Sequence, residues 1–167
     1  MSIQTIRASI HSPQKAYMWE VEIQGAIAGA LPDLTLFAKT ASIPPSSVDP
    51  IVINHKGGKA HYAGKNSSAH TVSIAFFDDE AQTIQDFMYE WYDNYISNPS
   101  TATSADKSQY TADILIKFKD SHDESVTASW KLTKAFPTEI GEVSLSYESS
   151  DLIELPVTFS YDEKIKL

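Results

Sequence analysis

The residues of this sequence that could do chemistry lie in two short polar stretches, the first of which is residues 58–65, GKAHYAGK. Glycines followed by a lysine are typical of a phosphate-binding loop, in which backbone N–H groups and the lysine contact phosphate and a following hydroxyl residue binds magnesium. Here the first glycine, Gly58, stands one residue too early, and Asn66 replaces the hydroxyl residue. The sequence therefore favours a flexible contact loop over a nucleotide site.

The second polar stretch, residues 120–124, could collect a divalent cation, because hard cations prefer several carboxylate oxygens. It contains Asp120, His122, Asp123 and Glu124, but it lies between two alternating runs and lacks the glycine of a calcium-binding loop. A solvated hairpin turn is favoured. The other histidines are scattered, and neither a His-Glu-x-x-His nor a Gly-x-Ser-x-Gly motif occurs. We expect no catalytic residue, no cofactor, no metal site and no enzymatic activity.

Composition limits the function further. The 167 residues suit one domain over residues 1–167. Thirteen basic residues against 22 acidic ones give a net charge of -9, which disfavours nucleic-acid binding over the whole surface. The absence of cysteine excludes disulfides, thiolate catalysis and cysteine-based metal sites. Residues 1–20 lack the apolar core of a signal peptide and no window approaches membrane-spanning length, so we expect synthesis in the cytoplasm and no membrane partner.

Alternating apolar side chains predict seven or eight strands. Short strands are also expected near residues 34–39 and 51–53, with the prolines at 44, 45 and 50 forming a bridge that is incompatible with a strand. Phe136 and Pro137 are expected to interrupt the sheet. The apolar positions of the clearest strands are Tyr17, Trp19, Val21 and Ile23; Val72, Ile74 and Phe76; Ala112, Ile114, Ile116 and Phe118; and Val126, Ala128, Trp130 and Leu132.

One segment has the three- and four-residue spacing of an amphipathic helix, over about residues 79–97. Its aromatic residues Trp91, Tyr92 and Tyr95 are expected to pack on the sheet. Asp79 and Gln82 resemble a capping box, and Asn98-Pro99 ends the helix. Its acidic residues lie mainly off the apolar stripe.

Two alternating runs close the chain within residues 141–163. Val143, Leu145 and Tyr147 are expected on the core face of the first run, and the second run carries Pro156, which restricts it to an edge or a bulge. The opposite face of both runs consists of hydroxyls and carboxylates, with no lysine, arginine or large apolar group. That face needs a function other than packing.

Residues 129–163, SWKLTKAFPTEIGEVSLSYESSDLIELPVTFSYDE, resemble the tail tube proteins of contractile-tailed bacteriophages. The resemblance depends on the order of Trp130, Phe136-Pro137-Thr138, Gly141-Glu142 and the stretch 147–151. Upstream, YMWEVEI, KTASIPP, YAG, DDEA and FMYEWY are also similar to that family, so the match spans about residues 17–161. Residues 1–14 fall outside it and are expected to form an extended N-terminal segment.

The resemblance implies a mainly β, sandwich or barrel-like fold with one helix at its side, and hexameric rings that stack into a hollow tube. It also implies a place in the virion, with the tail sheath, tape-measure, baseplate and tail-terminator proteins as partners, and transient passage of DNA without specific binding. Closing a sheet with neighbouring copies removes its exposed edges, and contacts along an axis need not close, so a tube is physically reasonable.

Three surfaces are expected to serve such a tube. A positively charged contact loop over residues 55–69 would join subunits or rings through His55, Lys56, Gly57, Gly58, Lys59, His61, Tyr62 and Lys65. A lumen lined by Ser144, Ser146, Glu148, Thr158 and Ser160 would repel phosphate over a Debye length of about 8 Å, so that DNA slides through it. The acidic residues Asp86, Glu90 and Asp93 would face the sheath.

Two other functions remain open. A ring protein of a type VI-like or bacteriocin injection system would share the same physics and differ in biological context. A carbohydrate-binding β-sandwich would need an exposed aromatic cluster, whereas the tyrosines here are expected to face mostly toward the core.

Overall fold

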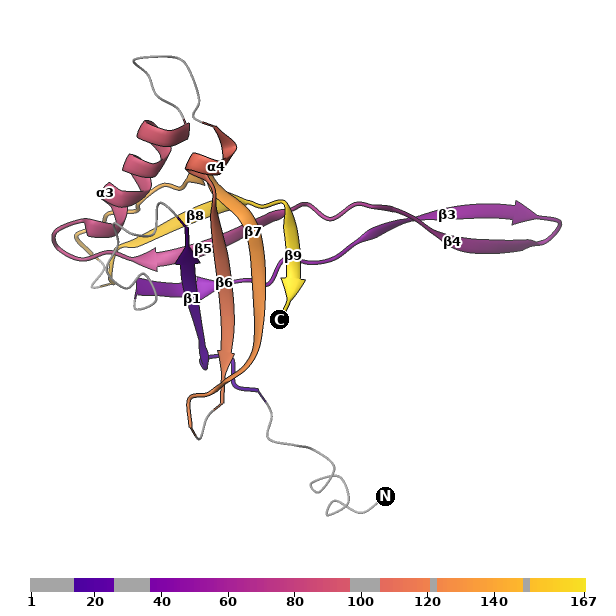
Figure 1. Ribbon diagram of the computed structural model, residues 1–167, viewed down its shortest axis with the longest axis horizontal. Helices are drawn as coiled ribbons and strands as arrows, with labels where there is room; N and C mark the ends of the chain where they lie inside the picture. The colour runs from indigo at the N-terminus through magenta and orange to yellow at the C-terminus, as the bar shows by residue number, and fades with distance from the viewer. Residues whose placement is uncertain (1–13, 26–36, 97–105, 121–122, 149–150) are drawn as a thin grey trace.

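The computed structural model describes residues 14–25, 37–96, 106–120, 123–148 and 151–167 (Figure 1). The fold is mainly β, as predicted. Its elements are β1 (Trp19–Gln24), β2 (Ala38–Ala41), β3 (Val48–His55), β4 (Gly58–Asn66), β5 (Thr71–Phe77), α3 (Thr83–Glu90), η2 (Trp91–Ile96), α4 (Lys107–Tyr110), β6 (Ala112–Lys119), β7 (Val126–Ile140), β8 (Glu154–Ser160) and β9 (Glu163–Lys166).

The body is a 7-stranded antiparallel sheet that bends into two layers. Its order is β1-β6-β7-β8-β5-β2, with β9 also paired to β7. β7 belongs to both layers, because it pairs with β6 up to Ala135 and with β8 from Phe136 onward. The bend follows Lys134, whose φ of 50° lies in the left-handed region. The layer of β1, β6, β7 and β9, here called layer A, therefore crosses the layer of β2, β5 and β8, here called layer B (Figure 1).

The core lies between the layers, on the faces that the alternation predicted. Val72, Ile74 and Phe76 of β5 are buried, and so are Leu155, Val157 and Phe159 of β8. The α3 helix covers this core with Ile84, Phe87 and Met88. Trp91 is fully buried at the start of η2, and its indole N–H donates to the carbonyl of Tyr110 at 2.8 Å. The expected helix thus begins later than residue 79 and continues from Trp91 with π-helical hydrogen bonding.

The N-terminus of α3 is held by two aspartates rather than by the predicted capping box. Asp79 accepts the backbone N–H and the hydroxyl of Thr83, at 2.9 and 2.8 Å. Asp78 accepts the N–H of Ile84 at 3.0 Å and that of Gln85 at 3.2 Å. Gln82 itself adopts a left-handed conformation with no side-chain cap.

Two expectations about the C-terminal half have different outcomes. Phe136 and Pro137 do not end a strand, because β7 continues through them after its bend. β8 is a central strand over residues 157–160, but Pro156 lies beyond the end of its pairing with β7 and has β5 as its one strand neighbour, as an edge position requires. The carbonyl of Pro156 accepts the N–H of Gly141 at 2.7 Å, just where β7 ends. Since the N and O atoms of one strand residue face the same neighbour, the missing N–H of Pro156 falls beyond β7 and costs β5 no hydrogen bond.

The first of the two closing runs is not a strand. After Ile140 the chain follows an irregular path over residues 141–148, because the proline of the partner strand donates no hydrogen bond that would extend the ladder. Val143 is half-buried, but Leu145 and Tyr147 are exposed, with relative accessibilities of 76% and 111%. The prediction that these two side chains enter the core is therefore wrong.

The expected contact loop is also regular structure. β3 and β4 form a two-stranded hairpin that projects from the body (Figure 1), and we call residues 48–66 the arm. His55 pairs with Gly58 across a turn of two residues, in which Gly57 has a φ of 89° that favours glycine. Pro50, expected to be incompatible with a strand, is paired with Ala63 beside a register shift. Residues 1–13 of the expected N-terminal segment lie outside the described part.

Candidate assembly surfaces

The arm is exposed along its whole length. Each residue of β3 is exposed, and in β4 Gly64 alone is half-buried. Large apolar side chains lie open on it, including Ile51 at 54%, Ile53 at 51% and Tyr62 at 57% accessibility. The eight predicted contact residues lie on β4, the turn and the end of β3: His55, Lys56, Gly57, Gly58, Lys59, His61, Tyr62 and Lys65. A hairpin this exposed has no hydrophobic reason to be ordered unless another surface covers it.

The base of the arm is fixed to the body by a lysine and several serines. The Lys164 ammonium contacts the carbonyl of Pro44 and the hydroxyl of Ser46, the latter at 2.8 Å. It also lies 5.2 Å from the centre of the Trp130 ring, on β7. Ser67 donates its N–H to the carbonyl of Ser47 at 2.9 Å, which closes the base. The direction of the arm is thus set by a contact with β9, whose Lys164 lies in turn over Trp130 of β7.

The outer face of layer B carries hydroxyl groups. In register, Thr71 pairs with Ser160, and Ser73 pairs with Thr158. Glu154 lies on the same face, paired with the ammonium of Lys39. Two of the five predicted lumen residues, Thr158 and Ser160, therefore lie on a continuous hydroxyl-rich surface.

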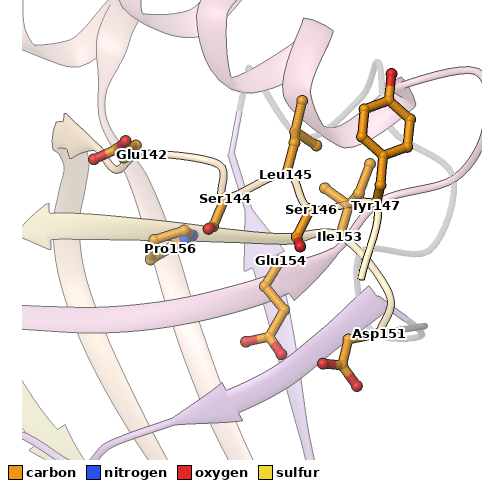
Figure 2. Close-up of a pocket in the computed structure, with 9 residues that line it drawn as sticks. All are labelled: Glu142, Ser144, Leu145, Ser146, Tyr147, Asp151, Ile153, Glu154 and Pro156. Carbon is orange, nitrogen blue, oxygen red and sulfur yellow. The ribbon is translucent and has the colours of Figure 1, made fainter. Parts of the chain in front are cut away.

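The other three predicted lumen residues, Ser144, Ser146 and Glu148, lie on the irregular segment 141–148. Because that segment is not a strand, the common polar face on which they were grouped with Thr158 and Ser160 does not exist. Ser144 and Ser146 instead line an open pocket of about 840 Å³ between this segment and β8 (Figure 2). We call it the groove; it is lined by Glu142, Ser144, Leu145, Ser146, Tyr147, Asp151, Ile153, Glu154 and Pro156.

The groove combines apolar and acidic side chains. Leu145 and Tyr147 point to one side in Figure 2, and the carboxylates of Asp151 and Glu154 point to the other. Ile153 adds an apolar side chain that is 38% accessible. Large exposed apolar groups that are gathered beside carboxylates are typical of an interaction surface.

The acidic residues predicted to face a sheath are exposed. Asp86 and Glu90 lie on α3, and Asp93 lies on η2. The pKa of Asp79, at the helix N-terminus, is lowered by the hydrogen bonds from the backbone N–H and the hydroxyl of Thr83. This end of the helix therefore stays negatively charged in mildly acidic conditions.

The outer face of layer A differs from that of layer B, because ion pairs cover it. Lys117 lies between Glu20 and Glu22, and Lys131 pairs with Asp113 at 2.8 Å. Hydrogen bonds from Gln24 and Lys117 lower the pKa of Glu22, and the bond to Glu22 raises that of Lys117. Lysines paired with carboxylates lie on this surface, whereas hydroxyl groups lie on the outer face of layer B.

Comparison with known proteins identifies the family. The family model described as phage tail tube protein matches residues 7–165. The chain belongs to this family. The tail tube protein of Serratia phage KSP90 is 24% identical over 142 residues, which are 83% of this chain and 79% of that protein.

Solved structures share the fold. A sheath/tube terminator of an extracellular contractile injection system superposes with a TM-score of 0.71 at 17% identity, covering 95% of this chain and 99% of the other. The tube-terminating cap of the anti-feeding prophage gives 0.69 at 20% identity, covering 100% and 99%. The tail tube of SPP1 gives 0.59 at 13% identity, covering 92% and 78%. The predicted tail-tube fold is confirmed.

Three further features of this tail tube protein concern metal ligands, membrane-spanning helices and exposed tyrosines. Among the residues that the structure describes, no group of three or more His, Cys, Asp or Glu side chains could hold a metal ion, and no helix is long and apolar enough to cross a membrane. His122 lies outside the described residues. The expectation that the tyrosines face mostly inward is wrong for Tyr17, Tyr62, Tyr89 and Tyr147, which are exposed on four different segments.

Proposed function

We propose that this tail tube protein forms hexameric rings that stack into the inner tube of a contractile phage tail. The tube would hold the tape-measure protein and then conduct the genome, inside a sheath and between the baseplate and terminator proteins. The observation that carries the proposal is the arm, an ordered hairpin whose apolar side chains no described part of the chain covers. The fold shared with a tube cap and a sheath/tube terminator supports the contractile context.

The arm is the proposed link between copies. Three lysines, at positions 56, 59 and 65, accompany its apolar side chains, against one acidic residue, Asp49. Since the whole chain has a charge of -9, a basic arm is attracted to the surface of the next copy. Each exposed ion pair contributes little, so repetition around a ring provides the strength.

The outer face of layer B is the proposed wall of the lumen. Thr71, Ser73, Thr158 and Ser160 present hydroxyls there, and the positive charge of Lys39 is compensated by Glu154. These hydroxyl residues provide neither a guanidinium group that would bind phosphate nor an aromatic ring on which a base would stack. The outer face of layer A is instead crowded with charge: its Lys117, Lys119 and Lys131 are paired with carboxylates, and ammonium groups can exchange such partners for phosphate, which hydroxyls cannot do. DNA should therefore slide along layer B.

The acidic side of α3 and η2, with Asp86, Glu90 and Asp93, is the proposed sheath contact. The virion tail would be its location, after synthesis in the bacterial cytoplasm. A tube of a related injection device is the second candidate, because the tube cap of the anti-feeding prophage shares the fold. Neighbouring genes for a capsid and for DNA packaging would favour the phage, and neighbouring toxin genes the injection device.

Shortening the arm tests the proposal. Pro50 and Ala63 are paired, so replacing residues 51–62 by Asn-Gly gives a short hairpin without disturbing the base. We expect a folded protein whose circular dichroism spectrum remains of the β type, weaker only by the loss of the arm. We expect no tubes in negative-stain micrographs under conditions in which the unaltered chain should form hollow fibres. Normal tubes from the shortened chain would refute the role of the arm.

A further inference from the structure

Among residues 14–25, 37–96, 106–120, 123–148 and 151–167, none fills the groove beside β8 and none covers the arm. Leu145, Tyr147 and Ile153 are exposed in the groove, as Ile51, Ile53 and Tyr62 are on the arm. Figure 1 shows the arm projecting from one side of the body, while α3 and the β7–β8 connection lie on the other. One chain therefore carries two complementary surfaces that point in different directions.

We infer that the groove receives the arm of a second copy of this chain. This rests on the proposed function, in which the arm joins copies, and names the surface on which it docks. Apolar side chains would meet apolar side chains: the arm contributes Ile51 and Ile53, and the groove contributes Leu145 and Tyr147.

Charge supports the same pairing. Three carboxylates line the groove, those of Glu142, Asp151 and Glu154, and Glu148 follows the lining residue Tyr147 in the sequence. Lys39 pairs with Glu154, and Glu142 and Glu148 add negative charge at the groove. The arm is basic through its three lysines, at 56, 59 and 65. An acidic groove favours a basic ligand and repels a second acidic surface, such as the α3 side of another copy.

The geometry also explains why the contact would build a polymer. A contact between two different surfaces of one chain is head-to-tail, so each copy that uses its arm still offers a groove to the next. Such contacts continue until a ring closes or a filament grows. A patch that pairs with itself would stop at a dimer.

The chain has no cysteine, so engineered cysteines report the contact without background. Under assembly conditions, a mixture of Ile53→Cys and Leu145→Cys chains should form disulfide-linked dimers on oxidation. Val126→Cys is the matched control, because Val126 is also an exposed apolar residue, at 51% accessibility, but lies outside the groove. We expect no linkage between Ile53→Cys and Val126→Cys.

A charge exchange separates this inference from the proposed function. Lys56→Glu with Lys59→Glu on the arm should raise the concentration needed for assembly at least about tenfold, and Glu142→Lys with Asp151→Lys in the groove should do the same. Mixed together, the two variants should recover assembly with each other. The acidic arm of the first variant then meets the basic groove of the second, and the unaltered basic arm of the second meets the unaltered acidic groove of the first. The Asp86→Lys, Glu90→Lys variant should not rescue the arm variant.

Each result has one meaning. Normal assembly of the arm variant overturns the arm as a link between copies, and with it this inference, but leaves the proposed tube standing. Loss of assembly in the arm variant, together with no disulfide at Leu145 and no rescue by the groove variant, overturns the groove as the docking site and leaves the role of the arm intact. If the groove variant does not fold, the disulfide between Ile53→Cys and Leu145→Cys decides alone.

Discussion

Replacing Ile51 and Ile53 by alanine should weaken assembly without weakening the fold. In the single chain these side chains are 54% and 51% accessible, so about half of each remains to be buried by a partner. Full burial of an isoleucine contributes about 1.5–3 kcal/mol. Burying the remaining half contributes about 1 kcal/mol, most of which alanine loses. The double variant should therefore lose about 2 kcal/mol per arm contact, which raises the critical concentration for assembly about 30-fold.

The matched control is the same change in the core. Ile74 is fully buried, so Ile74→Ala should lower the free energy of unfolding by about 2–5 kcal/mol. The arm variant should change it by less than about 0.5 kcal/mol per site, as exposed substitutions do. Urea unfolding measures the fold, and pelleting at a series of concentrations measures assembly. A critical concentration that stays within about threefold of the unaltered chain would refute the reasoning, as would a loss of stability like that of Ile74→Ala.

Three further predictions concern other sites. Asp79→Asn should destabilise the protein most above about pH 4, and the difference should shrink as the pH falls. The folded pKa of Asp79 is below its ordinary value of 3.8, so the contribution of its carboxylate is complete above 3.8 and is lost as the pH falls through the folded pKa. Unfolding measured against pH tests this. Gly64→Ala should distort the base of the arm and abolish tubes in micrographs, because the added Cβ would lie 2.2 Å from the Asp49 carbonyl oxygen. Gly58→Ala should assemble normally, because the atom nearest to its added Cβ would be 3.7 Å away. Ser73→Lys should slow DNA ejection from virions, because it puts a cation on the proposed lumen wall. Ser129→Lys, on layer A, should leave the ejection rate unchanged. Equal ejection rates for the two variants would contradict the assignment of the lumen.

Burial patterns made the core predictable. The alternation of Val72, Ile74 and Phe76 fixed the inward face of β5, and the spacing of Ile84, Phe87 and Trp91 fixed the helix stripe. These patterns exist because each element has one covered face. The ordered resemblance over residues 17–161 then led to the family that the comparisons confirm.

The arm could not be recognised in the same way. Neither of its faces is covered by the chain, so burial imposes no alternation on residues 55–66. Its polar, glycine-rich composition resembles a loop. The β-branched residues Ile51, Val52 and Ile53 did predict a short strand, but its continuation to His55 and its partner β4 were missed, although the Gly57 turn was a signal for a hairpin.

The segment 141–148 shows the opposite failure. Its alternation is as regular as that of β8, but no strand partner continues beyond Gly141, so Leu145 and Tyr147 face solvent. Alternation predicts which side chains face the core only where an adjacent strand supplies hydrogen-bond partners. The sequence of one segment does not show where the adjacent strand ends. β9 was missed because four residues, Glu163–Lys166, are too few to show a period.

Cryo-electron microscopy of the tubes formed by the unaltered chain tests the central claim most directly. The account predicts a hollow tube in which the arm of each subunit lies on another subunit, between segment 141–148 and β8, and in which Ser73, Thr158 and Ser160 face the bore. A chain that remains solitary at high concentration, or a tube whose bore is lined by the lysines of layer A with every arm extended into solvent, would contradict it.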